Sequence, residues 1–287
     1  MSYQQVLAAF ISLFALALAW QPPSYSGYSR VWKADFIGTE YALPSTSTWN
    51  IITGDNNYNN ESQTYTSSSR NIRLGGAGTL QLIPRKDASA AHGWTSARIE
   101  SKYTLTPVAG KITRVESSLR LAGNAASHKQ AIWPAFWLLG DSNRRGTLWP
   151  ACGEVDIMEN INGQKIAYGS VHCDVAPGGI CNENTGINAQ TTLADNKFHV
   201  WRVDFNRKST NFKEQSITWY LDGKKFHSVT GSKIGKLSVW KALCQSPLYV
   251  ILNVAVGGYW PGYPNAKTYG GKGSMMEVGY VAHYVSK

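Results

Sequence analysis

The sequence has 287 residues, enough for one large domain with a sizeable hydrophobic core. Charged residues make up 16% of it, below the roughly 25% of an average globular protein. The 11 Trp and 15 Tyr favour a β-protein with an aromatic binding surface over a helical protein. The formal net charge is +10, but no basic run is longer than a pair, so we expect no nucleic-acid partner.

The chain starts with an apolar, uncharged run at residues 6–20. A membrane-spanning helix needs about 20 such residues, and this run stops short of that. Ala17 and Ala19 supply the small-x-small pattern of a cleavage site. We therefore predict a signal peptide at residues 1–19, a secreted mature chain with no membrane anchor, and one folded domain at residues 20–287.

Short β-type segments separated by turn signals fill the rest of the chain. They are residues 79–84, 96–103, 111–120, 198–205, 216–221, 248–256 and 277–285. Asp222 and Gly223 form the strongest short hairpin signal, and no long segment has the 3.6-residue apolar period of a helix. Many strands without alternating helices predict an all-β fold: a β-jelly-roll sandwich of two curved antiparallel sheets.

One predicted strand carries three carboxylates in an otherwise apolar run. Side chains alternate along a strand, so Glu154 and Asp156 share a face while Glu159, five positions from Glu154, would point the opposite way. A β-bulge at Ile157-Met158 would absorb one residue and return Glu159 to the shared face. Bulges are common next to active sites because they re-aim side chains, so the pattern favours a catalytic strand.

Paired carboxyl groups on one face can hydrolyse glycosidic bonds. Retaining glycosidases hold two of them about 5–5.5 Å apart, one as nucleophile and one as acid/base. Between Glu154 and Glu159, Asp156 would push the two pKa values apart. These residues alone do not indicate which glutamate has which role.

Two other interpretations of the three carboxylates remain. Charged residues often alternate with apolar ones on a solvated strand, and clustered carboxylates can bind calcium. Both are disfavoured, because the segment is flanked by aromatic residues rather than by Lys or Arg, and it carries Val155, Ile157 and Met158.

Four cysteines allow three disulfide pairings. Cys173 and Cys181 bracket a turn-rich loop and are the preferred pair, which leaves Cys152 and Cys244. A zinc site is the alternative, but no CxxC or HxxxH spacing supports it.

"GEVDIMEN" at residues 153–160 resembles the active-site signature of glycoside hydrolase family 16, in its laminarinase-type branch. The loop "APGGICNE" (176–183) resembles the fungal secreted members. Further matches in the same order cover nearly all of residues 30–285: "RVWKADFIG" (30–38), "NNESQTYT" (59–66), "TSARIESK" (95–102), "WPAFWLLG" (133–140), "GSVHCD" (169–174) and "LNVAVGG" (252–258).

The resemblance implies a role for each residue of the signature. Glu154 would be the nucleophile that forms the glycosyl-enzyme intermediate. Glu159 would protonate the leaving oxygen and then activate water, and Asp156 would orient and tune Glu154. His172 matches the active-site histidine of the family, although a lone histidine is more often part of a core.

The resemblance also implies a substrate-binding cleft lined by aromatic and polar side chains. Tryptophans commonly belong to the hydrophobic core, so for each of them a core position is the alternative to a place in the cleft. Asn60 also starts the chain's only glycosylation sequon, a role that competes with substrate contact, and we favour the cleft. The candidate substrate-binding residues, besides His172, are Asn60, Arg98, Trp133, Trp137, Trp149 and Trp260.

The last strand departs from the family pattern. Gly279 stands where the family usually has an aspartate that helps to hold a structural calcium, so no metal is expected, and no cofactor is implied. The resemblance therefore implies a monomeric, secreted endo-β-1,3(4)-glucanase that acts on β-1,3- or mixed β-1,3/1,4-glucan with retention of configuration. The alternatives are a relative that acts on another polysaccharide, such as a galactan, a transglycosylase, and a non-catalytic β-glucan-binding lectin.

Overall fold

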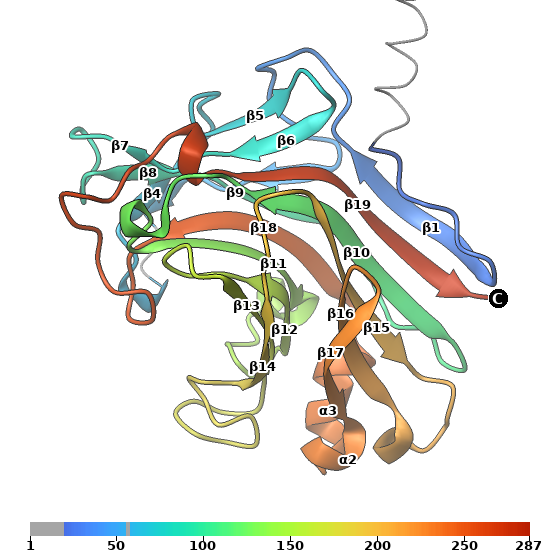
Figure 1. Cartoon of the computed structure of the whole chain (residues 1–287). Helices are drawn as coiled ribbons and strands as arrows, with labels where there is room; N and C mark the ends of the chain where they lie inside the picture. The colour runs from blue at the N-terminus through green and yellow to red at the C-terminus, as the bar shows by residue number, and fades with distance from the viewer. Residues whose placement is uncertain (1–19, 56–57) are drawn as a thin grey trace, which may run out of the picture.

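The computed structural model describes residues 20–55 and 58–287, and the predicted signal peptide lies outside these residues. Two large antiparallel sheets dominate the described chain (Figure 1). This is the two-sheet jelly-roll architecture that the recurring short strands predict.

The first large sheet has eight strands in the described part of the chain, with β19 at its centre. One edge of β19 pairs with β10, and the other pairs with β6 and then with β1. In spatial order its strands are β17 (Lys224–Thr230), β16 (Ser216–Leu221), β15 (His199–Asn206), β10 (Ile112–Leu121), β19 (Met276–Ser286), β6 (Thr79–Leu82) and β5 (Ile72–Gly75), with β1 (Tyr28–Asp35) beside β19.

The second large sheet carries the acidic strand, β12, near its middle. Antiparallel pairing joins β12 to β11 on one side and to β13 on the other. Its strands are β14 (Ile187–Thr192), β13 (Ile166–His172), β12 (Glu154–Glu159), β11 (Ile132–Gly140), β18 (Leu248–Val256), β9 (Arg98–Leu105) and β2 (Trp49–Ile51).

The remaining elements are short. A small sheet contains β3 (Gly54–Asp55), β4 (Gln63–Tyr65), β8 (Trp94–Ser96) and β7 (Arg85–Lys86). The α-helices are α2 (Gly231–Ile234) and α3 (Leu237–Cys244). The 3₁₀ turns are η1 (Tyr58–Asn60), η2 (Ala126–His128), η3 (Asp141–Arg145), η4 (Phe212–Glu214) and η5 (Lys272–Ser274).

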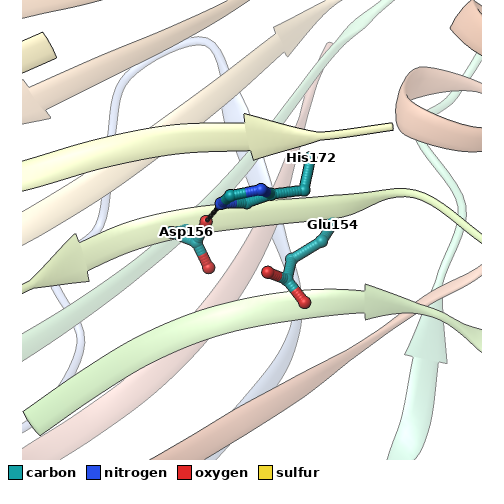
Figure 2. A group of neighbouring side chains, drawn as sticks. All are labelled: Glu154, Asp156 and His172. Carbon is teal, nitrogen blue, oxygen red and sulfur yellow. Dashed lines mark ion pairs between the residues drawn. The ribbon is translucent and has the colours of Figure 1, made fainter. Parts of the chain in front are cut away.

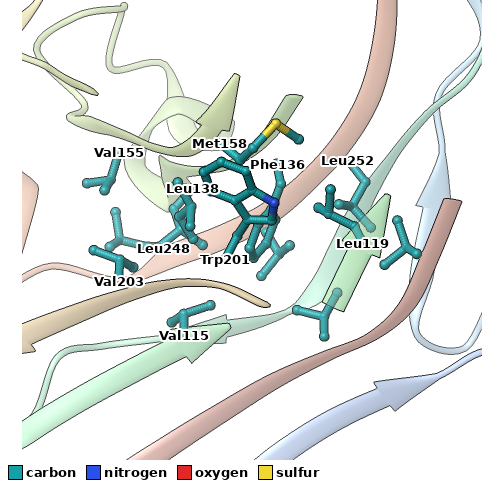
Figure 3. Packing of buried hydrophobic residues seen from close by; sticks show 14 of the residues in the cluster. Val115, Leu119, Phe136, Leu138, Val155, Met158, Trp201, Val203, Leu248 and Leu252 are labelled. Atoms are coloured by element: carbon teal, nitrogen blue, oxygen red, sulfur yellow. The ribbon is translucent and has the colours of Figure 1, made fainter. Parts of the chain in front are cut away.

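The hydrophobic core lies between the two large sheets. Val115 and Val203 on the first sheet and Leu138 and Val155 on the second are at most 1% exposed and belong to one cluster (Figure 3). Side chains alternate along each strand, so one set points into this core and the other set points to the outer face of the sheet.

Two predictions from local sequence signals, the hairpin and the disulfide, are confirmed. Asp222 and Gly223 both have positive φ and connect β16 to β17. Cys173 and Cys181 are bonded, whereas Cys152 and Cys244 are buried free thiols. None of the helices in the described residues is long and apolar enough to cross a bilayer.

Gly279 does not fit a calcium site. It offers no side-chain oxygen, and a Cβ at this position would overlap the indole ring of Trp20. Trp20 also packs on Phe198, with ring centroids 3.9 Å apart. An aromatic side chain therefore lies where the family pattern has an acidic one.

Candidate active site

A β-bulge in β12 brings the three carboxylates to one face, as the sequence predicts. Pairing with β11 shifts between Phe136 and Trp137, and pairing with β13 shifts between Asp156 and Glu159. On β13 the partners of the three carboxylates lie two residues apart, as do their partners on β11, so all belong to one face. The pairs are Glu154 with His172 and Leu139, Asp156 with Ser170 and Trp137, and Glu159 with Tyr168 and Ala135.

The bulge is held from the core side. The indole Nε1 of Trp219, on β16 of the opposite sheet, donates a 2.7 Å hydrogen bond to the backbone carbonyl of Asp156. A bulge disrupts the ladder locally, and this bond satisfies a buried carbonyl beside it. Val155, Ile157 and Met158 are at most 1% exposed and anchor the strand in the core.

The acidic groups lie close to one another and to His172. Figure 2 shows Glu154 and Asp156 side by side, with the ring of His172 against Asp156. His172 Nε2 is 3.4 Å from Asp156 Oδ2, an ion-pair distance, but Oδ2 has no hydrogen-bond partner among the described residues. Trp133 Nε1 donates a 3.0 Å hydrogen bond to Glu159 Oε1.

Burial and mutual repulsion raise the carboxyl pKa values. Burial raises the pKa of Glu154 to about 7, helped by Glu159 and opposed by the charge of His172. Burial, then the charges of Glu159 and Glu154, raise the pKa of Asp156 well above its usual range. Burial also raises the pKa of Glu159, against the charge of His172 and the Trp133 hydrogen bond. Because closely spaced carboxylates repel one another, ionisation of one disfavours ionisation of the others.

Sequence reasoning missed a further carboxylate at this site, that of Glu183. Glu183, 5% exposed, lies beyond the disulfide, and its Oε2 is 2.6 Å from His172 Nδ1. Glu183 is separated from the acidic signature along the chain, so the sequence does not indicate its contact with His172. The one available signal is its position two residues after Cys181.

Two of the predicted tryptophans form an aromatic group beside Glu159. The rings of Trp133 and Trp260 meet edge-on at 5.3 Å, and Trp260 meets Tyr168 edge-on at 5.0 Å. Trp260 is 43% exposed. Tyr168, which the sequence analysis did not select, therefore belongs to this group.

Trp149 lies near the other end of the carboxylate row. It is 37% exposed, and its ring centroid is 5.7 Å from that of His172, which pairs with Glu154 across the strands. The partly exposed aromatic rings therefore flank the carboxylates on both sides.

Trp137 and Arg98 lie next to each other on neighbouring parts of the same sheet. The guanidinium of Arg98 lies over the Trp137 ring, 5.0 Å from its centroid, and is 2.8 Å from Glu100. Trp137 Nε1 donates a 2.7 Å hydrogen bond to Asn253 Oδ1. The charge of Arg98 also lowers the pKa of Glu154, so this polar group is coupled to the carboxylates.

Asn60 is exposed and lies in the turn η1, with positive φ. Its Nδ2 donates to the hydroxyl of Tyr263, and the neighbouring Asn59 carbonyl accepts from the backbone of Tyr259. Asn60 therefore lies by the loop that carries Trp260. Its roles as a substrate contact and as a glycosylation site both stay predictions.

The calcium interpretation of the carboxylates fits this geometry poorly. Calcium prefers six to eight oxygen ligands. The closest ion partner of Asp156 is instead a ring nitrogen of His172. The solvated-strand interpretation is wrong, because Asp156 and Glu159 are 3% and 7% exposed.

A jelly roll with buried carboxyl groups aligned on one face and partly exposed aromatic rings on both sides defines the chain as a glycoside hydrolase. The family model described as "XgeA-like, catalytic GH16 domain" matches residues 47–232. The chain therefore belongs to glycoside hydrolase family 16, whose enzymes retain the anomeric configuration.

Three known proteins illustrate the similarity. The crystal structure of endo-1,3-β-glucanase from Streptomyces sioyaensis is 33% identical, with a TM-score of 0.86, and the match covers 93% of this chain and 99% of that one. A β-glucanase from Rhodothermus marinus is 27% identical over 82% of this chain and 78% of its own length. Glucan endo-1,3-β-glucosidase A1 from Niallia circulans is 29% identical over 91% of this chain but only 38% of its own length.

Proposed function

We propose that this chain cleaves internal bonds of β-1,3- or mixed β-1,3/1,4-glucan with retention, using Glu154 as nucleophile and Glu159 as acid/base. The observation that carries this proposal is the register of β12, which aligns the two glutamates with Asp156 between them on one face. Retaining hydrolysis needs two carboxyl groups that flank the scissile bond, one ionised as the nucleophile and one protonated as the acid.

The match to the family signature gives Glu159 the role of the general acid. Burial raises its pKa above the usual range of a carboxyl group, and its protonated form delivers a proton to the glycosidic oxygen. After the leaving sugar departs, the same carboxylate takes a proton from water, which attacks the anomeric carbon and releases the enzyme.

The match to the family signature gives Glu154 the role of the nucleophile. The positive charge of His172 and that of Arg98 favour its ionised form, against burial. Its carboxylate oxygen attacks the anomeric carbon as the bond to the leaving oxygen breaks. Burial and the charges of Glu159 and Glu154 raise the pKa of Asp156 well above its usual range, which favours its neutral form beside the nucleophile.

The aromatic rings suit a polysaccharide substrate. Sugar rings present C–H faces that pack on aromatic side chains, and Trp260 and Trp149 offer partly exposed rings on either side of the carboxylates. A glucan chain bound along the line of carboxyl groups would place one of its internal glycosidic bonds between Glu154 and Glu159. Endo-cleavage of a β-glucan is also the activity named for the similar Streptomyces sioyaensis protein.

The test is the release of reducing sugar from laminarin, barley mixed-linkage glucan and cellulose. The wild type is expected to act on laminarin, the mixed-linkage glucan or both, and their ratio gives the linkage preference. Glu154→Gln is expected to lose at least about 10³-fold of the activity, and Glu159→Gln about 10²–10⁴-fold. Glu214→Gln, an exposed position away from the site, is the matched control.

Azide separates the two roles. With an activated aryl β-glucan oligosaccharide as substrate, it can replace the missing nucleophile in Glu154→Ala and attack the glycosyl-enzyme intermediate in Glu159→Ala, so the two variants should yield glycosyl azides of opposite anomeric configuration. The same anomer from both variants would contradict the assignment. A wild type that binds laminarin but releases no sugar would favour a lectin, and longer products would favour a transglycosylase. Activity only on a galactan would indicate a different polymer.

The chain acts outside the cell as a monomeric catalytic domain spanning residues 20–287, without nucleic-acid or membrane partners. The disulfide between Cys173 and Cys181 supports this location, because such bonds persist in oxidising compartments. N-terminal sequencing of protein from the culture medium, together with light scattering, tests the cleavage site and the monomeric state.

A further inference from the structure

The segment after β13 forms a support for one face of His172. It runs through residues 173–186 and is closed by the disulfide between Cys173 and Cys181. Two of its residues contact the imidazole: Glu183 lies at Nδ1, and Gly186 lies against Cε1. A Cβ at position 186 would be 2.7 Å from Cε1, so the ring fits only because this residue is glycine.

Glu183 forms an ion pair with this histidine. Its side chain is fully buried, Oε2 is 2.6 Å from His172 Nδ1, and Oε1 accepts a 2.7 Å hydrogen bond from the backbone N–H of Cys173. A carboxylate can only accept, so the hydrogen between the two side chains lies on Nδ1 of His172. A buried carboxylate is costly unless it is paired, and His172 is the only cationic side chain in ion-pair contact with it in the described chain.

The bond at Nδ1 determines what the other ring nitrogen faces. With Nδ1 held by Glu183, Nε2 points to Asp156, at 3.4 Å. Trp149 lies by the same ring, with centroids 5.7 Å apart. The imidazole is thus held on several sides, and its orientation beside the acidic strand follows from Glu183 and Gly186.

We propose that Glu183 is a positioning residue that orients His172 and keeps it positively charged beside the carboxylates of β12. The effect on turnover rests on the proposed function, whereas the effect on His172 itself does not. Without this charge, the ionised nucleophile would lose the cation that lowers its pKa most.

The electrostatics of the site agree with this geometry. Burial alone would lower the pKa of His172, but the hydrogen bond to Glu183 and the surrounding carboxylates outweigh it and raise the pKa to about 9. In return, the charge of His172 lowers the pKa of both Glu154 and Glu159. The titratable and charged groups of this cluster, besides His172, are Glu154, Asp156 and Glu159 on β12, Glu183 on the loop, and Arg98 on β9.

Removing only the charge of Glu183 tests the proposal. In Glu183→Gln the amide oxygen can still accept from Nδ1–H, so the ring keeps a partner and loses the negative charge. His172 should then release its proton at a pH at least about 2 units lower. Because the effect of His172 on Glu154 exceeds that of Glu183, the nucleophile should become harder to ionise.

The first measurement is an NMR titration of protein labelled with ¹⁵N-histidine. The wild type should give a His172 midpoint near pH 9 with Nδ1 protonated, and Glu183→Gln a midpoint near or below the usual value of about 6.5. Equal midpoints in the two proteins overturn the proposal. A wild-type midpoint at or below about 6.5 overturns it as well, even if the variant does not fold. Neither result depends on the proposed function.

The second measurement is the pH profile of laminarin hydrolysis. For Glu183→Gln we expect kcat to fall about 10–100-fold at the optimum with little change in KM, and the acid limb of kcat/KM to move to higher pH. Glu183→Asp, which keeps the charge, should recover part of kcat. A loss that is the same for Asp and Gln, with an unmoved pH profile, would indicate a purely structural role. Glu214→Gln again serves as the matched control.

Discussion

The indole N–H of Trp133 donates a 3.0 Å hydrogen bond to the carboxyl group of Glu159, across neighbouring strands. Trp133 also meets Trp260 edge-on at 5.3 Å. One tryptophan therefore joins the aromatic group to the proposed general acid. A hydrogen bond to a carboxylate favours its charged form, so Trp133 limits how far burial raises the pKa of Glu159.

Replacing Trp133 by phenylalanine should change the acidity of Glu159. The ring is retained while the donor is lost, so the pKa of Glu159 should rise further. Glu159 would then keep its proton to higher pH, and the alkaline limb of kcat/KM should move up by about 0.5–1 unit. Measuring laminarin hydrolysis between pH 4 and 10 tests this shift.

Trp137→Phe is the matched control for this experiment. Its indole N–H bonds to the side chain of Asn253, not to a carboxyl group. We expect the altered packing to raise KM but to leave the alkaline limb of kcat/KM at the wild-type pH. Equal shifts in the two variants would mean that the Trp133 hydrogen bond does not set the acidity of Glu159.

Neutralising Glu154 should stabilise the fold in a pH-dependent way. Its pKa is about 7 in the native chain against an ordinary 4.5, so the native state resists losing this proton. Below pH 4.5 the group is protonated in both states, whereas stability is lost as the pH rises from 4.5 through 7. Glu154→Gln should therefore match the wild type at pH 4 and exceed it by about 1–3 kcal/mol at pH 8. Urea unfolding at both pH values measures the difference, and a pH-independent difference would contradict the expectation.

His283 should contribute to acid denaturation. It lies buried on β19, with Nδ1 2.9 Å from the Tyr103 hydroxyl, and burial lowers its pKa to about 4. As the pH falls from the ordinary 6.5 towards 4, the unfolded chain takes up a proton that the native chain refuses, so stability is lost across this interval.

Replacing His283 by glutamine should remove that part of the acid transition. The variant is expected to lose about 1–3 kcal/mol less than the wild type between pH 6.5 and 4, in urea unfolding at each pH. His92→Gln, at an exposed position, is the control. The same pH dependence in His283→Gln and in the wild type would show that another group is responsible.

The acidic strand could be predicted because its evidence is local. The spacing of Glu154, Asp156 and Glu159 requires one extra residue to bring all three to one face, and the bulge lies at that residue. The hairpin at Asp222-Gly223 and the disulfide were predictable for the same reason, since each depends on a few neighbouring residues.

Contacts set by strand register were not predictable from one sequence. Tyr168 faces Glu159 only because β13 pairs with β12 in a particular register, and Asn253 reaches Trp137 from β18. Helix α3 is only eight residues long, too short to give a clear apolar period. Glu183 depends on how the disulfide-closed loop folds back on His172.

The contact between Trp20 and Gly279 was likewise not predictable from the sequence. It predicts that substitutions at the two positions have coupled effects on the free energy of unfolding. A methyl group at position 279 would overlap the indole of Trp20, which packs on Phe198. Gly279→Ala should therefore lower the free energy of unfolding by about 1–3 kcal/mol. In a Trp20→Ala background the same change should cost less than about 0.5 kcal/mol, because the space is then free.

A double-mutant cycle by urea unfolding tests this coupling, with Gly123→Ala as the control. At Gly123 the nearest described atom to an added Cβ is Asn196 Nδ2, at 3.8 Å, so a methyl group fits and should change stability by less than about 0.5 kcal/mol. If Gly279→Ala costs the same with and without the indole, Trp20 does not fill the space over this strand. A coupling energy above about 1 kcal/mol would instead establish that a packed aromatic ring stabilises the position where the family pattern has an aspartate.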